Sequence, residues 1–167
     1  VFVGGSDVGA GEAVLHAVRK SFVPQYGLTV SVMLDSNGSN TTAAAAVRAA
    51  SKHMDLGQAR ALVLGGTGPV GQRVARLLAR QGADVRIGSR SVERAQAVAA
   101  SIKAAITDAD ASRQAARCGV RADSMAACRR AWPPRGGSSN SRHASAPVIA
   151  VALRERGAKP LQRGVLA

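Results

Sequence analysis

The chain has 167 residues, of which 23 are lysine or arginine, 10 are aspartate or glutamate and 46 % are apolar. The apolar content is enough for a hydrophobic core, and no apolar run reaches the roughly 20 residues that a membrane-spanning helix needs. The two cysteines are too few for a disulfide scaffold or a structural zinc site. The net charge of +13 is uneven, because residues 1–111 carry +4 and residues 112–167 carry +9.

The first 34 residues predict two strands with a helix between them. Val1–Val3 is apolar and ends at a glycine pair, which is typical of a short strand and its turn. Ala10–Phe22 has apolar residues at helical spacing and basic residues near its end, where the helix dipole favours cations. Leu28–Leu34 has the composition of a buried strand.

Residues from about 40 to 105 continue this alternation of strands and helices. An alanine-rich helix is predicted up to about Lys52, and its first turn can be capped by Asn40 or Thr41. The further elements are a strand at Ala61–Gly65, a helix at Pro69–Gln81, a strand at Ala83–Gly88 and a helix from Ser91 to about Ala105. This order predicts an α/β fold with a parallel sheet covered by helices.

A glycine-rich loop lies between the strand at Ala61–Gly65 and the following helix, which is the position of a dinucleotide-binding fingerprint. We expect Gly66 to permit the tight turn, Gly68 to let a pyrophosphate approach the backbone and Gly71 to allow close packing of helix and strand. The predicted cofactor-binding residues of the loop are Gly66, Thr67, Gly68, Pro69, Val70 and Gly71. The alternative is a glycine turn of some other α/β protein.

The end of the next strand indicates which dinucleotide would bind. An NAD site has an acidic residue there for the ribose 2′-hydroxyl, whereas this chain has Ser89 and Arg90, with Arg94 one helical turn later. An arginine can pair with a 2′-phosphate and a serine can donate to it, so these residues predict NADP. The alternative is that Arg90 and Arg94 are ordinary solvated charges at a helix end.

A polar loop follows the strand at Leu28–Leu34, at the kind of sheet edge where ligands of α/β proteins bind. Its hydrogen-bonding side chains form the predicted substrate site, namely Asp35, Asn37, Ser39, Asn40, Thr41 and Thr42. The alternative is a turn that only caps the next helix, which would account for Gly38 and Asn40 but not for so many successive polar groups.

The segment MLDSNGSNTTAAAAV (Met33–Val47) resembles the NADP-dependent methylene-tetrahydromethanopterin and methylene-tetrahydrofolate dehydrogenases of one-carbon metabolism. The opening VFVGGSDVGAGEAVLHAVRKSF is similar to part of their substrate domain, and ALVLGGTGPVGQRVARLLARQGADVRIGSRSVERAQAVA is similar to their nucleotide domain. The resemblance covers residues 1 to about 116, so we expect an internal fragment of a longer protein.

The resemblance implies an organisation and an activity. Residues 1–55 would be the end of an α/β pterin-binding domain, residues 56–116 a truncated Rossmann NADP-binding domain, and residues 117–167 a disordered basic tail. A pterin would lie between the domains and transfer a hydride to NADP⁺, which requires orientation of two carbons rather than a catalytic triad. No catalytic residue and no metal ligand is assigned, and a cytoplasmic homo-oligomer without membrane association is expected.

The arginine-, proline- and glycine-rich tail matches no module, and only Val148–Leu153 is predicted to form regular structure there. We hypothesise that residues from about 117 onward are a frameshifted translation. The remaining alternatives are an NADP-binding fragment without activity, a shikimate-dehydrogenase-like NADP oxidoreductase, and a basic nucleic-acid-binding protein, the last disfavoured because the tail has one aromatic residue. The residues do not distinguish a methanopterin from a folate substrate.

Overall fold

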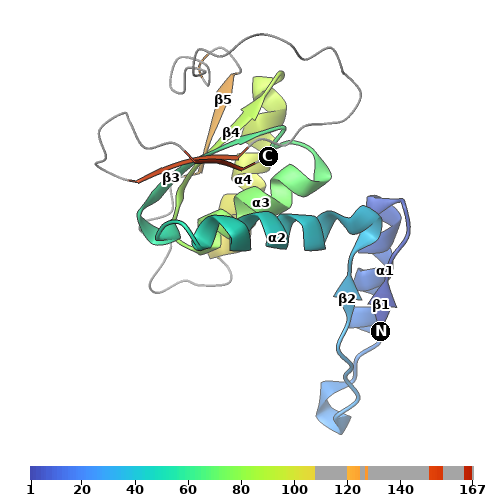
Figure 1. The fold of residues 1–167 in the computed structure, drawn as a ribbon. Helices are drawn as coiled ribbons and strands as arrows, with labels where there is room; N and C mark the ends of the chain where they lie inside the picture. Colours follow the sequence, from blue (N-terminus) through green and yellow to red (C-terminus); the bar gives the residue numbers. More distant parts are fainter. Residues whose placement is uncertain (108–119, 125–126, 128–150, 156–163, 167) are drawn as a thin grey trace.

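The computed structural model describes residues 1–107, 120–124, 127, 151–155 and 164–166. These residues form a small two-stranded sheet and a five-stranded sheet, joined through a long helix (Figure 1). The α/β class predicted from the alternation of strands and helices is confirmed, and the boundaries proposed for the domains stay a prediction.

The N-terminal sheet consists of β1 (Phe2–Val3) and β2 (Met33–Leu34), which pair in parallel. Helix α1 (Val8–Lys20) connects them and begins two residues earlier than predicted, because Asp7 caps it by accepting a 2.9 Å hydrogen bond from the N–H of Ala10.

The strand predicted at Leu28–Leu34 was wrong in its extent, since only Met33–Leu34 pairs. The short 3₁₀ helix η1 (Pro24–Tyr26) precedes it, and Gly27 then turns the chain with a φ of 69°. Leu28 and Val30 are exposed, so these apolar side chains are not buried against other described residues. A strand-like composition therefore did not lead to a strand here.

Helix α2 (Ser39–Ser51) leads from the small sheet to the large one and packs along α3 (Pro69–Arg80). The short turn η3 (Leu56–Gln58) then begins the large sheet. Its parallel part consists of β3 (Ala59–Leu64), β4 (Asp84–Ser89) and β5 (Val120–Ser124), with helix α4 (Val92–Thr107) between the last two.

The strand order of the large sheet is β5-β4-β3-β6-β7, in which β6 is Val151–Glu155 and β7 is Gly164–Leu166. β3, β4 and β5 are parallel, as predicted, but β6 pairs antiparallel with β3 and β7 antiparallel with β6. β5, β6 and β7 all lie in the segment expected to be a disordered tail. β6 overlaps Val148–Leu153, the stretch predicted to form regular structure, whereas β5 and β7 were expected to be disordered, and that expectation was wrong for them. Apart from Ala127, the rest of the segment lies outside the described residues.

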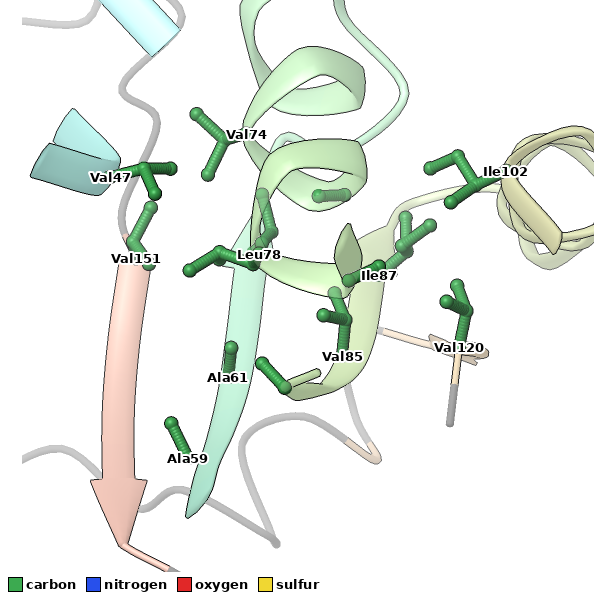
Figure 2. Close-up of a cluster of buried hydrophobic side chains, with 14 of the residues drawn as sticks. Val47, Ala59, Ala61, Val74, Leu78, Val85, Ile87, Ile102, Val120 and Val151 are labelled. Atoms are coloured by element: carbon green, nitrogen blue, oxygen red, sulfur yellow. The ribbon is translucent and has the colours of Figure 1, made fainter. Parts of the chain in front are cut away.

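The core lies between the large sheet and its helices (Figure 2). Helix α3 buries Val74 and Leu78 against the sheet, and Ile102 of α4 covers the side of β4 and β5. The apolar stripe of α3 repeats at three and four residues, so one face enters the core and the opposite face is left for polar side chains. Because α3 packs against the sheet, its start is held close to the end of β3.

Candidate cofactor and substrate site

The glycine loop lies where β3 ends and α3 begins. Gly65 adopts the left-handed conformation with a φ of 68°, so this residue, rather than Gly66, makes the turn that the sequence predicted. Gly66 is required for a different reason, because a Cβ there would lie 2.6 Å from Cγ2 of Ile87. Gly71 fits its predicted role, since its Cβ would meet the carbonyl oxygen of Gly65 at 2.4 Å.

Gly68 is the N-cap of α3 and has no side chain with which to satisfy the first turn. Its own N–H donates to the carbonyl of Gly65 at 3.0 Å, and a Cβ at Gly68 would meet nothing closer than 3.4 Å. Pro69 occupies the first helical position, where a missing N–H has no consequence. The first N–H groups of this helix have no partner within the helix, which is the arrangement by which helix starts of dinucleotide-binding domains bind a pyrophosphate.

Ser89 ends β4 and Arg90 follows it at the sheet edge where this loop lies, and Arg94 lies in the first turn of α4. Leu64 at the end of β3 is in register with Gly88 of β4, so both strands end at the same edge of the sheet. Ser89 is buried and its hydroxyl accepts a hydrogen bond from the N–H of Ser91. Arg90 and Arg94 are exposed, and neither side chain has a polar partner within the part of the chain that the structure describes.

The start of α4 next to these arginines is capped. The hydroxyl of Ser91 accepts from the N–H of Arg94 at 3.2 Å and donates to Glu93 at 2.8 Å. The pKa of Glu93 is lowered by a hydrogen bond from its own N–H and by the Ser91 hydroxyl. Glu93 is therefore held as an anion at the helix start, where the dipole favours it.

The polar loop after β2 is organised around Asp35 rather than around Asn40 or Thr41, which the sequence predicted as caps. Asp35 Oδ1 accepts from the N–H groups of Asn40 and Thr41 at 2.9 and 3.0 Å, and Oδ2 accepts from the Thr41 hydroxyl at 2.7 Å. The Thr41 hydroxyl and N–H are the main causes of a lowered pKa at Asp35. Asn37, in the turn η2 (Ser36–Gly38), adopts a φ of 56°.

The six residues predicted for the substrate do not all face one space. Ser39 is buried and donates to the carbonyl of Ser36, while Asn37 and Thr42 are exposed. Asp35 and Thr41 bond to each other, as described above. Asn40 is half-buried, donates from Nδ2 to the carbonyl of Leu34 and lines a cleft. Most of the loop's polar side chains are therefore used in hydrogen bonds within the loop and at the start of α2.

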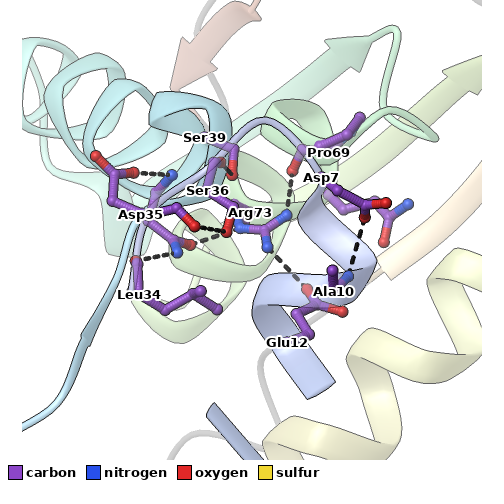
Figure 3. Close-up of polar contacts among 12 residues, drawn as sticks. Asp7, Ala10, Glu12, Leu34, Asp35, Ser36, Ser39, Pro69 and Arg73 are labelled. Carbon is purple, nitrogen blue, oxygen red and sulfur yellow. Dashed lines mark hydrogen bonds and ion pairs between the residues drawn. The ribbon is translucent and has the colours of Figure 1, made fainter. Parts of the chain in front are cut away.

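Arg73 of α3 connects the polar loop with the glycine loop, and sequence reasoning missed it (Figure 3). Its guanidinium donates from Nε to Asn40 Oδ1 at 2.5 Å, from Nη1 to the carbonyl of Pro69 at 2.9 Å and from Nη2 to Glu12 at 2.8 Å. No sequence signal identified it, because an arginine on the polar face of an amphipathic helix ordinarily faces solvent.

A cleft of about 580 Å³ lies between α1, β2 and α2 on one side and α3 on the other. Among the predicted substrate residues, Asn40 lines it. The described residues contain no helix that is both long and apolar enough to cross a membrane. They also contain no group of three histidine, cysteine or acidic side chains placed to hold a metal ion.

A strand, a glycine loop and a helix, followed by a parallel strand that ends beside the loop, define a Rossmann-type domain. Residues 1–37 match the family model described as methylene-tetrahydromethanopterin dehydrogenase, N-terminal. Residues 48–128 match the model described as shikimate / quinate 5-dehydrogenase.

The chain is also similar to a protein of Methylorubrum extorquens named bifunctional protein MdtA, with 47 % identity over 123 residues. The matched region is 70 % of this chain and 42 % of that relative, so the chain spans less than half the length of the relative. The resemblance to the methylene-tetrahydromethanopterin dehydrogenases, predicted from Met33–Val47 and its flanks, is confirmed.

Proposed function

We propose that the protein is an oxidoreductase that transfers a hydride from methylene-tetrahydromethanopterin, or from methylene-tetrahydrofolate, to NADP⁺ and forms the methenyl pterin. The observation that carries this proposal is the common edge of β3 and β4, where the glycine loop lies beside Ser89 and Arg90. The matches of residues 1–37 and 48–128 to dehydrogenase families support it.

The residues of this edge have distinct tasks in the proposal. The N–H groups after Gly68 would hold the pyrophosphate, and Ser89 and Arg90 would bind the 2′-phosphate. Bound NADP⁺ would supply the hydride acceptor. The chain itself would orient the two reactants and exclude water, with Asn40 as the loop residue that lines the cleft next to α3. No proton-transferring residue is required of it.

The decisive activity test compares NADP⁺ and NAD⁺ reduction with methylene-tetrahydromethanopterin and with methylene-tetrahydrofolate. We expect NADP⁺ reduction with one of the two pterins and much slower NAD⁺ reduction. Inactivity with both pterins, under conditions in which NADP⁺ binds, would leave the alternative of an NADP-binding fragment without activity.

Arg90→Ala tests the cofactor preference. Loss of a charge-assisted contact to the 2′-phosphate is expected to weaken NADP⁺ binding by about tenfold to a hundredfold and to leave NAD⁺ binding unchanged. Fluorescence titration of both dinucleotides measures this difference. The matched control is Arg48→Ala, an exposed arginine on α2, which should alter neither affinity. Equal losses for NADP⁺ and NAD⁺ would refute the role of Arg90.

A shikimate-type NADP oxidoreductase is the second candidate, and the match of residues 48–128 favours it. Shikimate oxidation with NADP⁺, measured beside the pterin reactions, distinguishes the two. Residues 1–37 favour the pterin enzyme, because they match the N-terminal domain of the methylene-tetrahydromethanopterin dehydrogenases. The expected homo-oligomer, cytoplasmic location and lack of specific nucleic-acid binding stay predictions.

A further inference from the structure

The cleft between α1 and α3 has a strongly basic lining. Helix α3 contributes Arg73, Arg76 and Arg80, which share one face because they are spaced by three and four residues. Arg19 of α1 lines the opposite wall. The acidic residue of the lining is Glu12, and it pairs with Arg73. Three guanidinium groups therefore have no acidic partner within the cleft.

Arg76 is the most informative of these three arginines. Its Nε is buried away from solvent and has no hydrogen-bond partner among the described residues. A buried donor without an acceptor costs free energy, and a cationic one costs more than a neutral one. A side chain that belonged only to a solvated helix face would keep this atom in water. Arg76 also lines the cleft, so the other donors of its guanidinium, rather than the covered Nε, are those that an acceptor entering the cleft would meet.

The other lining residues fit an anionic ligand of moderate size. The carboxamides of Asn40 and Gln72 provide neutral hydrogen-bonding groups, and Leu15 and Leu77 provide apolar surface. A volume of about 580 Å³ lies in the range of small-molecule sites. None of residues 66–71 lines the cleft, although Gln72 and Arg73 of its wall donate to the carbonyls of Thr67 and Pro69 in the neighbouring glycine loop.

We propose that this cleft binds a ligand that carries a phosphate or a cluster of carboxylates, with Arg76 as its main contact and Arg19 and Arg80 at the sides. Guanidinium groups pair with both kinds of anion through two parallel hydrogen bonds. This chemistry can come from two sources. One is an anionic part of the pterin substrate, which rests on the proposed function, and the other is a separate phosphorylated metabolite.

Inorganic phosphate, titrated calorimetrically into the purified protein at constant ionic strength, tests the site without any need for activity. We expect saturable binding that Arg76→Gln weakens by about tenfold or more and Arg80→Gln weakens less. Arg48→Gln removes the same charge outside the cleft and should leave binding unchanged. Equal binding by the wild type and Arg76→Gln, or no saturable binding, overturns the proposal.

Thermal unfolding provides an independent readout in case Arg76→Gln changes the fold. Without ligand, the variant should unfold at the same temperature as the wild type or higher, because it lacks the buried unpaired donor. Phosphate should raise the unfolding temperature of the wild type and of Arg76→Lys more than that of Arg76→Gln. A clear loss of stability in phosphate-free Arg76→Gln would show that Arg76 stabilises the fold, and would contradict a role in ligand binding alone.

Steady-state kinetics then separates the two sources. If the anion belongs to the pterin, Arg76→Gln should raise the KM for the pterin and leave the KM for NADP⁺ unchanged. If it belongs to another metabolite, both KM values should stay at the wild-type level while phosphate binding is lost. A failure of the proposed dehydrogenase function would remove the kinetic arm and leave the calorimetric result intact.

Discussion

Gly71 is a glycine of the loop that the fold itself requires, whereas Gly68 matters only for the proposed cofactor binding. A Cβ at Gly71 would collide with backbone atoms, 2.4 Å from the carbonyl oxygen of Gly65 and 2.8 Å from Cα of Gly66. Backbone cannot move aside as a flexible side chain can. We expect Gly71→Ala to lower the free energy of unfolding by about 1–3 kcal/mol, as measured by urea denaturation.

Gly68→Ala is the matched comparison, because the added Cβ would meet only the Gly65 carbonyl oxygen at an ordinary 3.4 Å. We expect near wild-type stability but weaker NADP⁺ binding, since the methyl group would occupy the place where a pyrophosphate approaches the helix start. Unfolding curves and dinucleotide titrations of the same two preparations check both statements. Wild-type cofactor affinity in Gly68→Ala would remove this residue from the binding site.

Asp35 predicts how stability depends on pH. Hydrogen bonds from Thr41 and Asn40 place the pKa of its carboxyl below the ordinary value of 3.8. The unfolded chain therefore binds more protons than the folded one in this range. The stabilisation is present above about pH 4 and is lost as the pH falls through the lower pKa of the folded state.

The test is the stability difference between the wild type and Asp35→Asn, measured by urea denaturation at several pH values. The difference should be largest near neutral pH and should shrink below about pH 4. Thr41→Val removes the hydroxyl donor and should show a smaller effect in the same range. A difference that is independent of pH would mean that the charge of Asp35 does not contribute.

At the scale of elements, Arg73 holds α1, α2 and α3 together. Its side chain is 15 % exposed and that of Glu12 is 57 % exposed, so the ion pair by itself should contribute less than about 1 kcal/mol. Arg73→Met also removes donors from Asn40 and Pro69, and we expect it to cost about 1–3 kcal/mol. Glu12→Gln is the comparison, and equal losses in urea denaturation would reduce the role of Arg73 to the ion pair.

Most elements around the glycine loop could be predicted, because their apolar periodicity agrees with their place in the sheet. Asp35 as the cap of α2 could not, since it acts across five and six residues through a turn in which Asn37 adopts a positive φ. Arg73 could not because its partners lie on elements distant in sequence. Val120–Ser124 was missed because its RADS sequence lacks the alternation of a half-buried strand.

At the scale of the whole molecule, the charge of the chain is divided between two regions. Most of the excess of +13 lies in residues 112–167, of which the structure describes only short stretches. The proposed binding sites instead use arginines of α1, α3 and α4 together with Arg90, which follows β4. The net charge is therefore a poor guide to function here, and single guanidinium groups in defined places are a better one.

The frameshift hypothesis can be checked on the nucleotide sequence. β5 and the match up to residue 128 both extend past residue 117, so we place any change of frame after residue 128. Translation of the following bases in another frame should give apolar, strand-like sequence that continues the dehydrogenase resemblance. If neither other frame does so, the hypothesis is wrong.

The position of β6 has a consequence for how the chain assembles. β3 pairs with β4 after a single helical crossover, but Ala59 and Val63 pair with Glu155 and Val151, roughly 90 residues further on. Closing so long a loop is slow compared with a local crossover. During synthesis, the second edge of β3 stays open until β6 leaves the ribosome, so the central strand of the sheet pairs on one side only while roughly 90 further residues are made.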